Sequence, residues 1–288
     1  MSGPAHASER LQFAVNGLTL VAEAYGPADG QPVLALHGWL DNAASFARLA
    51  PCLQTCRVVA LDQRGHGLSS HLKQPYHIWD GVVDVVAVLD QLGWQHAVLL
   101  GHSMGAAVAT LAASAFPERI TALWLIEGFG PWTDPDTEVP DLLRKATERL
   151  LALSDRRKPL YSSMDEALRA RILGGVVPLT ERAAWPIVQR GLKHTGDGWT
   201  WTADQHLTVP SQFRMDEPQV QTCIRRLSMP VSLALGQTGL FAKPGVLDAR
   251  IKLCDQVRVE TFPGGHHLHL EGAEGALSSW LNESLERA

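Results

Sequence analysis

Short runs rich in apolar residues alternate along this chain with longer amphipathic segments. The runs cover residues 33–36, 58–61, 97–100, 123–126, 231–235 and 257–261. Strands that are apolar on both faces are typical of a parallel sheet with helices on each side, because neither face of such a strand meets solvent. The alternation therefore predicts an α/β fold.

The ends of the chain add detail to this prediction. Asn16-Gly17 separates two stretches rich in strand-forming residues, 11–15 and 18–25, and predicts a tight antiparallel hairpin. Apolar residues recur every three or four positions in 78–92 and in 270–285, which indicates helices. With the six apolar runs, the hairpin gives a mostly parallel eight-stranded sheet flanked by helices.

One connection is far longer than those usual within an α/β unit. It lies between the sixth predicted strand, 123–126, and the next at 231–235, and it holds helical patterns at 141–153, 164–173 and 180–192. We predict a helical cap over 129–215, inserted into a core of residues 1–128 and 216–288. We expect most cap tryptophans to pack inside the cap and one or two to line an apolar pocket; they are Trp132, Trp185, Trp199 and Trp201.

Composition excludes several functions. The 25 Lys and Arg against 30 Asp and Glu give a net charge of −5, so nucleic acid and anionic membranes are not expected partners. The 4 cysteines have neither the density of a disulfide scaffold nor zinc-ligand spacing, so we expect reduced thiols and no metal or organic cofactor. We find no secretory leader and no membrane-spanning apolar stretch, which predicts a cytoplasmic protein. The oligomeric state stays open.

Residues 101–105, Gly-His-Ser-Met-Gly, follow one buried run and precede a stretch of small residues. This strand-turn-helix context is typical of a nucleophile elbow, in which a strained turn exposes a serine hydroxyl. Ser103 is therefore the candidate nucleophile. The backbone N–H of Met104, at the start of a helix, is a candidate oxyanion donor.

A serine hydroxyl needs a base to take its proton. Of the 12 histidines, we choose His266, which lies in a glycine loop after the last predicted strand, at the carboxyl edge of the sheet. His267 is the main alternative, and His269 is expected to start the final helix. The remaining histidines near glycine turns are expected to shape local hydrogen bonds; they are His37, His66 and His102.

Five segments together carry a resemblance to a known family. They are Leu36–Asn42, Asp62–Ser69, the 101–105 elbow, Ile126–Pro131 and His266–Glu271, with a weaker echo at Gly198–Asp204. The chain resembles the serine hydrolase-like branch of the α/β-hydrolase superfamily. The resemblance implies the chain order serine, acid, histidine, an oxyanion hole completed by the backbone N–H of Trp39, and a bracing role for the Asp62 loop.

The acid departs from the commonest pattern of that superfamily. An aspartate usually follows the seventh strand, but Gly239 stands at that place here. Glu127, at the end of the sixth strand, occupies the alternative acid position, and a carboxylate after an all-apolar strand needs a partner such as a histidine. We therefore choose Glu127, and Asp248 is the alternative acid.

The resulting prediction is a serine hydrolase that cleaves an ester or thioester of a small hydrophobic acyl substrate through an acyl-enzyme. Ser103 attacks, His266 carries the proton and Glu127 orients His266. A serine nucleophile argues against the alkyl-enzyme chemistry of dehalogenases and epoxide hydrolases, which needs a carboxylate. The alternatives are carbon-carbon bond hydrolysis or cofactor-free peroxidation on the same triad, and a receptor-like binding protein with a weakened triad.

Overall fold

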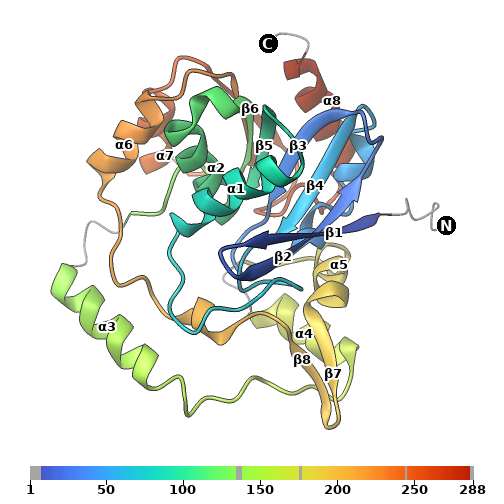
Figure 1. Cartoon of the computed structure of the whole chain (residues 1–288), viewed down its shortest axis with the longest axis vertical. Helices are drawn as coiled ribbons and strands as arrows, with labels where there is room; N and C mark the ends of the chain where they lie inside the picture. The colour runs from blue at the N-terminus through green and yellow to red at the C-terminus, as the bar shows by residue number, and fades with distance from the viewer. Residues whose placement is uncertain (1–7, 134–137, 175–176, 244, 286–288) are drawn as a thin grey trace.

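The computed structural model describes residues 8–133, 138–174, 177–243 and 245–285. Eight strands form one sheet in the order β1-β2-β4-β3-β5-β6-β9-β10 (Figure 1). Only the pairs β1-β2 and β2-β4 of this sheet are antiparallel. The strands are β1 (Glu9–Val15), β2 (Leu18–Tyr25), β3 (Gln31–Leu36), β4 (Cys56–Asp62), β5 (Ala97–His102), β6 (Ile120–Ile126), β9 (Val231–Gly236) and β10 (Val257–Phe262). The predicted fold class is confirmed.

The sheet separates two hydrophobic cores. Leu34 and Leu36 of β3 face one core, and Val33 and Ala35 face the other, so alternate residues of one strand are buried on opposite sides. The first core is covered by α1 (Asp80–Gln91), α2 (Met104–Ala115), α6 (Glu217–Arg225) and α7 (Val246–Ile251). The second is covered by α8 (Glu274–Leu285) and two short 3-10 helices, η1 (Ala43–Phe46) and η2 (Ala50–Cys52).

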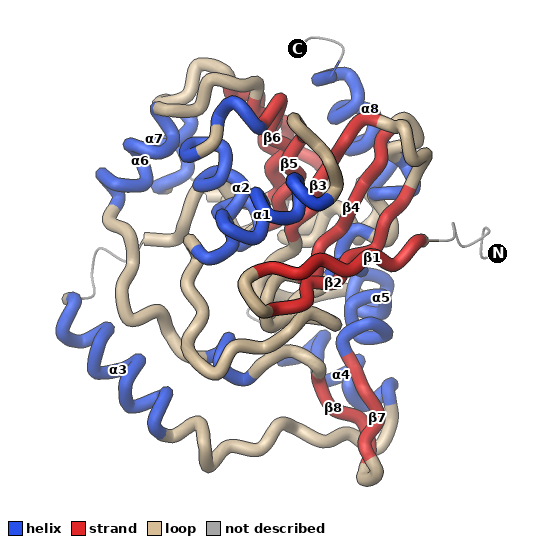
Figure 2. The backbone as a smooth tube through the Cα atoms, viewed as in Figure 1, coloured by secondary structure: helices blue, strands red, loops and turns tan. Residues whose placement is uncertain are grey.

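The long segment between β6 and β9, called the insertion below, is rich in helices. It contains α3 (Val139–Leu151), α4 (Met164–Gly174), α5 (Glu181–Gly191) and the 3-10 helix η4 (Gln205–Thr208). It also contains an antiparallel hairpin that the sequence does not predict, β7 (Leu192–Thr195) with β8 (Gly198–Trp201) (Figure 2). Neither strand is an apolar run, since one reads Leu-Lys-His-Thr and the other Gly-Trp-Thr-Trp, so the pattern that predicts the core strands is absent. The domain boundaries at 129 and 215 stay a prediction.

Three arginines of this insertion pair with carboxylates of the sheet core. Arg171 of α4 contacts Asp41 at 2.9 Å, Arg190 of α5 contacts Asp62 at 2.8 Å, and Arg182 contacts Glu274 at 2.9 Å. Both aspartates are buried, Asp41 in the loop after β3 and Asp62 as the last residue of β4. The pairs therefore fasten α4 and α5 over the carboxyl edge of the sheet.

The end of the chain differs from the prediction in one respect. The last helix begins at Glu274, so His269 lies in the preceding turns and does not start that helix. Gly272, with a φ of +116°, adopts a conformation that a helix does not accommodate, and so the helix starts after it. Within the described parts of the chain, every helix is too short or too polar to cross a bilayer.

Candidate active site

Ser103 lies in a strained turn between β5 and α2. Its φ of 53° and ψ of −112° fall outside the regions that a serine ordinarily adopts. A Cβ on Gly105 would lie 1.9 Å from the carbonyl oxygen of Leu36, and one on Gly101 would lie 2.6 Å from the Ala106 nitrogen. The two glycines therefore allow the tight turn, as the elbow motif predicts, and Met104 follows as the first residue of α2.

Glu127 is fully buried directly after β6, with a φ of 51°. Its Oε1 accepts a hydrogen bond of 2.8 Å from the Gly236 N–H. Its Oε2 accepts one of 2.8 Å from the Leu240 N–H and lies 3.0 Å from His266 Nδ1. Three contacts thus compensate a carboxylate that would be costly to bury alone.

Gly239 leaves the space that this carboxylate fills. A Cβ at residue 239 would lie 2.2 Å from Glu127 Oε1 and 2.5 Å from Glu127 Oε2. No such approach is possible without moving one of the two residues. The absence of a side chain at 239 is therefore what makes room for the carboxylate of Glu127.

The two alternative site residues have other partners. His267 Nε2 lies 2.9 Å from Asp41 Oδ2, so His267 contacts a different carboxylate from His266. Asp248 lies in α7, where its Oδ2 accepts a hydrogen bond from the Gly245 N–H at 2.6 Å. Among the candidates, the structure brings together His266 and Glu127.

Trp39 follows β3 in a loop that turns sharply toward the insertion. The Asp41 N–H donates to the Gly38 carbonyl at 3.1 Å, and Leu40 has a φ of 61°. The Trp39 indole is 43% exposed and donates to the Leu207 carbonyl at 3.0 Å. The ring thus lies outside the core and links the loop after β3 to η4.

Asp62 braces the neighbouring loops, as predicted. Its Oδ1 accepts from the Ala43 N–H at 2.7 Å and its Oδ2 from the Leu68 N–H at 2.9 Å. His37 also has the expected local role, because its Nε2 accepts from the Gln63 N–H at 3.0 Å.

Asp41 is a residue of this region that sequence reasoning missed. Its carboxylate contacts Arg171 through Oδ1 and His267 through Oδ2, each at 2.9 Å. Burial alone would raise the pKa of Asp41, but His267 and Arg171 outweigh it and hold the pKa well below its ordinary value. The only sequence signal is an acid two residues after the predicted oxyanion loop.

Four imidazoles gather around the end of β5. The ring of His102 lies 4.8, 4.7 and 4.4 Å from those of His266, His267 and His269, measured between centroids. His102 Nε2 lies 2.9 Å from the His266 carbonyl oxygen. Burial and the neighbouring imidazoles keep the pKa of His102 well below its ordinary value, so this ring is neutral.

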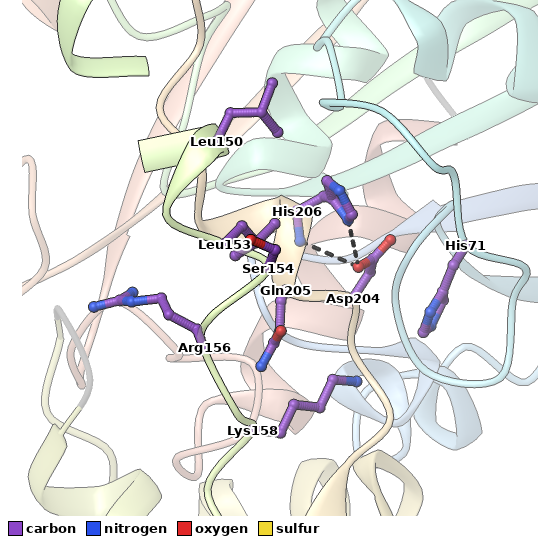
Figure 3. A pocket seen from close by; sticks show the side chains of 9 residues that line it. All are labelled: His71, Leu150, Leu153, Ser154, Arg156, Lys158, Asp204, Gln205 and His206. Atoms are coloured by element: carbon purple, nitrogen blue, oxygen red, sulfur yellow. Dashed lines mark hydrogen bonds and ion pairs between the residues drawn. The ribbon is translucent and has the colours of Figure 1, made fainter. Parts of the chain in front are cut away.

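An open pocket of about 470 Å³ lies between the end of α3, η4 and the loop at His71 (Figure 3). Its lining is largely polar and includes Lys158, Asp204, Gln205 and His206, with Leu150 and Leu153 as apolar members. Figure 3 shows Lys158 and Gln205 between the chain after α3 and the turn at Asp204. No cap tryptophan lines it, so this is not the apolar pocket that the sequence predicts.

Comparisons with known proteins place this geometry in context. The family model for the alpha/beta hydrolase fold matches residues 31–273. The human serine hydrolase-like protein 2 is 32% identical over 280 residues, which cover 90% of this chain and 88% of that protein. A hypothetical protein from Pseudomonas aeruginosa PAO1 has a solved structure with 41% identity and a TM-score of 0.89, covering 96% of this chain and 98% of that one. The thioesterase domain from the curacin biosynthetic pathway is 26% identical, with a TM-score of 0.85 and coverage of 96% and 99%.

Proposed function

Because this chain belongs to the α/β-hydrolase fold family, we propose that it is a serine hydrolase that cleaves an ester or thioester of a hydrophobic small molecule. The observation that carries this proposal is the contact between His266 Nδ1 and Glu127 Oε2 at 3.0 Å. It supplies an oriented base on the same sheet edge as the strained Ser103. A histidine held in this way is what a serine needs to become a nucleophile.

The proposed reaction has two stages. The Ser103 hydroxyl oxygen attacks the substrate carbonyl carbon while His266 Nε2 takes the hydroxyl proton. His266 then gives that proton to the leaving group, and the acyl group remains on Ser103. In the second stage, a water molecule loses a proton to His266 and attacks the acyl-enzyme, which releases the acid and restores Ser103.

The proposal gives Glu127 and two backbone groups supporting roles. Glu127 fixes the imidazole with Nδ1 protonated and stabilises the imidazolium that forms, while its bonds from Gly236 and Leu240 hold it in place. The N–H groups of Trp39 and Met104 stabilise the oxyanion. One such donor contributes about 2.7–4 kcal/mol to transition-state stabilisation in a well-formed oxyanion hole.

The thioester part of the proposal draws on the similarity to the curacin thioesterase domain. Carbon-carbon bond hydrolysis and cofactor-free peroxidation use the same scaffold and stay alternatives. A receptor-like binding protein is the alternative that the missing acid at Gly239 favours, and the Glu127–His266 contact supports the hydrolase instead. A cytoplasmic location stays a prediction.

The test is hydrolysis of p-nitrophenyl esters and acyl thioesters of increasing acyl length. We expect a rate with a preferred acyl length in the wild type and none above background in Ser103→Ala. His266→Ala should lose the rate, whereas His267→Ala should keep a measurable part of it. An active Ser103→Ala or His266→Ala protein would contradict the proposal.

A further inference from the structure

Asp41, His102 and His267 bring three possible metal ligands together in the interior. Asp41 comes from the loop after β3, His102 from the end of β5 and His267 from the loop after β10. All three residues are at most 4% exposed. One ligand atom of each lies within 4.8 Å of the other two.

The orientation of His102 leaves its Nδ1 atom without a hydrogen-bond partner. Because His102 Nε2 lies 2.9 Å from the His266 carbonyl oxygen, Nε2 carries the ring proton of this imidazole. Nδ1 is therefore a bare acceptor, and it has no hydrogen-bond partner. It lies 3.8 Å from Asp41 Oδ2, which is an acceptor too.

His102 Nδ1, a buried acceptor without a partner, needs a positive or hydrogen-donating group beside it, whereas Asp41 Oδ2 already has His267 Nε2 at 2.9 Å. A proton on His102 Nδ1 does not meet this need, because the 3.8 Å between Nδ1 and Asp41 Oδ2 is too long for a hydrogen bond. A metal cation or a water molecule meets it. The arrangement of the third residue, His267, favours the cation.

His267 completes a triangle of suitable size. Its Nε2 lies 2.9 Å from Asp41 Oδ2, and the side between the two histidine nitrogens is at most 4.8 Å. With the 3.8 Å side between His102 Nδ1 and Asp41 Oδ2, the point equidistant from the three atoms lies about 1.9–2.4 Å from each, a range that includes the length of zinc–nitrogen and zinc–oxygen bonds. His267 Nδ1 has no partner, so it can take over the ring proton when Nε2 binds a metal.

The atoms behind the three ligands match the surroundings of a metal site. Arg171 donates to Asp41 Oδ1 at 2.9 Å, which leaves Oδ2 for the ion. His102 donates its other N–H to a backbone carbonyl. Ligating carboxylates and histidines in metalloproteins have such partners, which fix the ligand orientation.

We propose that Asp41, His102 and His267 form a site for one divalent transition-metal ion of the zinc class. Two imidazoles and a carboxylate are donors that zinc accepts, with a fourth position left for water. The ion would join the three loops that carry Trp39, Ser103 and His266. The expectation of no metal came from Cys and His spacing, which does not reveal ligands on three distant loops.

Metal titration of the full chain tests the site. The protein is first freed of metal with a chelator, then titrated with zinc chloride by calorimetry and with cobalt(II) by visible absorption. We expect one zinc equivalent and an intense, four-coordinate cobalt spectrum. Asp41→Asn should weaken zinc binding by about 100-fold or more, because loss of a ligand exceeds the 10–100-fold effect of losing a supporting partner.

Two further variants make the result specific. His267→Gln removes a second ligand and serves if Asp41→Asn does not fold, as judged by circular dichroism. Asp204→Asn is the matched control, because Asp204 Oδ1 lies 3.0 Å from His206 Nδ1 but belongs to no group of three possible metal ligands among the residues that the structure describes. Loss of the zinc equivalent in the site variants and its retention in the control would support the site.

Three results would overturn it: no zinc binding by the wild type, a weak octahedral cobalt spectrum, or undiminished zinc binding by folded Asp41→Asn or His267→Gln. A water molecule would then bridge Asp41 and His102. Because the readout is binding, the result is independent of whether the protein hydrolyses esters.

Discussion

Replacing Gly239 by alanine tests whether Glu127 depends on the space beside it. The added Cβ would lie 2.2 Å from Glu127 Oε1, whereas ordinary contact begins near 3.4 Å, so the carboxylate or the chain at 239 must move by about 1 Å. The backbone itself does not oppose alanine, since Gly239 is not among the residues with a positive φ. The clash with the carboxylate therefore causes the whole effect.

The expected cost appears mainly in turnover. Displacing Glu127 lengthens its 3.0 Å contact with His266, and a misplacement of about 1 Å near a reacting group lowers the rate by about 100-fold. KM should change little, because Glu127 acts on the base and not on the substrate. The free energy of unfolding should fall by about 1–3 kcal/mol from overpacking.

The assay is steady-state hydrolysis of a p-nitrophenyl ester, with urea unfolding of the same samples. Gly275→Ala is the control, because a Cβ there meets open space in α8. Wild-type turnover in Gly239→Ala would refute the reasoning, since it would mean that the position of Glu127 does not matter for the reaction.

The same geometry predicts that an aspartate at position 239 can take over part of the role of Glu127. Glu127→Ala alone should lower turnover by about 10⁴-fold, as loss of a triad acid does. Adding Gly239→Asp puts a carboxylate in the vacated space and should recover at least about 10-fold of that loss. Gly239→Asp in the presence of Glu127 should instead be no better than Gly239→Ala, and equal activity of the single and double Glu127 variants would contradict the prediction.

Three further predictions concern the nucleophile, the fastening of the insertion and acid sensitivity. A fluorophosphonate should label one serine per chain, and mass spectrometry should find no label in Ser103→Ala. Arg190→Met removes the partner of Asp62, which is fully buried, so urea unfolding should report a loss of about 3–5 kcal/mol; a loss below about 1 kcal/mol would contradict the ion pair's role. Burial lowers the pKa of His66 to about 3, against about 6.5 in the unfolded chain. Between these values the unfolded chain holds a proton that the folded chain lacks, so stability falls as pH drops below about 6.5. The contribution of His66 is at most about 1.4 kcal/mol per pH unit, and His66→Gln should flatten the urea-derived profile by that amount; an unchanged slope would argue against a neutral buried His66.

The central strands of the sheet were predictable because they are apolar on both faces. β3 lies at Gln31–Leu36 where the sequence predicts 33–36, and β9 lies at Val231–Gly236 where it predicts 231–235. The hairpin of β7 and β8 was not predictable, because its strands are short and partly exposed. The burial pattern that reveals a strand is missing there.

The candidate site also contains residues that the sequence could indicate and residues that it could not. Glu127 could be chosen from the sequence because a lone acid after an all-apolar strand requires compensation. Asp41 could not, because its partners His267 and Arg171 lie 226 and 130 positions away. Only the folded chain brings them to one carboxylate. The sequence also allows both His266 and His267 as the base, since neighbouring residues in a glycine loop can point in different directions.

The position of the acid depends on the residue at 239 as well as on the residue at 127. A side chain at 239 and the carboxylate of Glu127 would occupy the same space, so this site accommodates an acid at one place or the other. With Glu127 in its proposed role, the glycine at the usual acid position does not indicate a weakened site in this chain. It is the condition under which Glu127 can accept hydrogen bonds from Gly236 and Leu240 and still contact His266. A search for the acid in such a chain therefore has to consider positions 127 and 239 together.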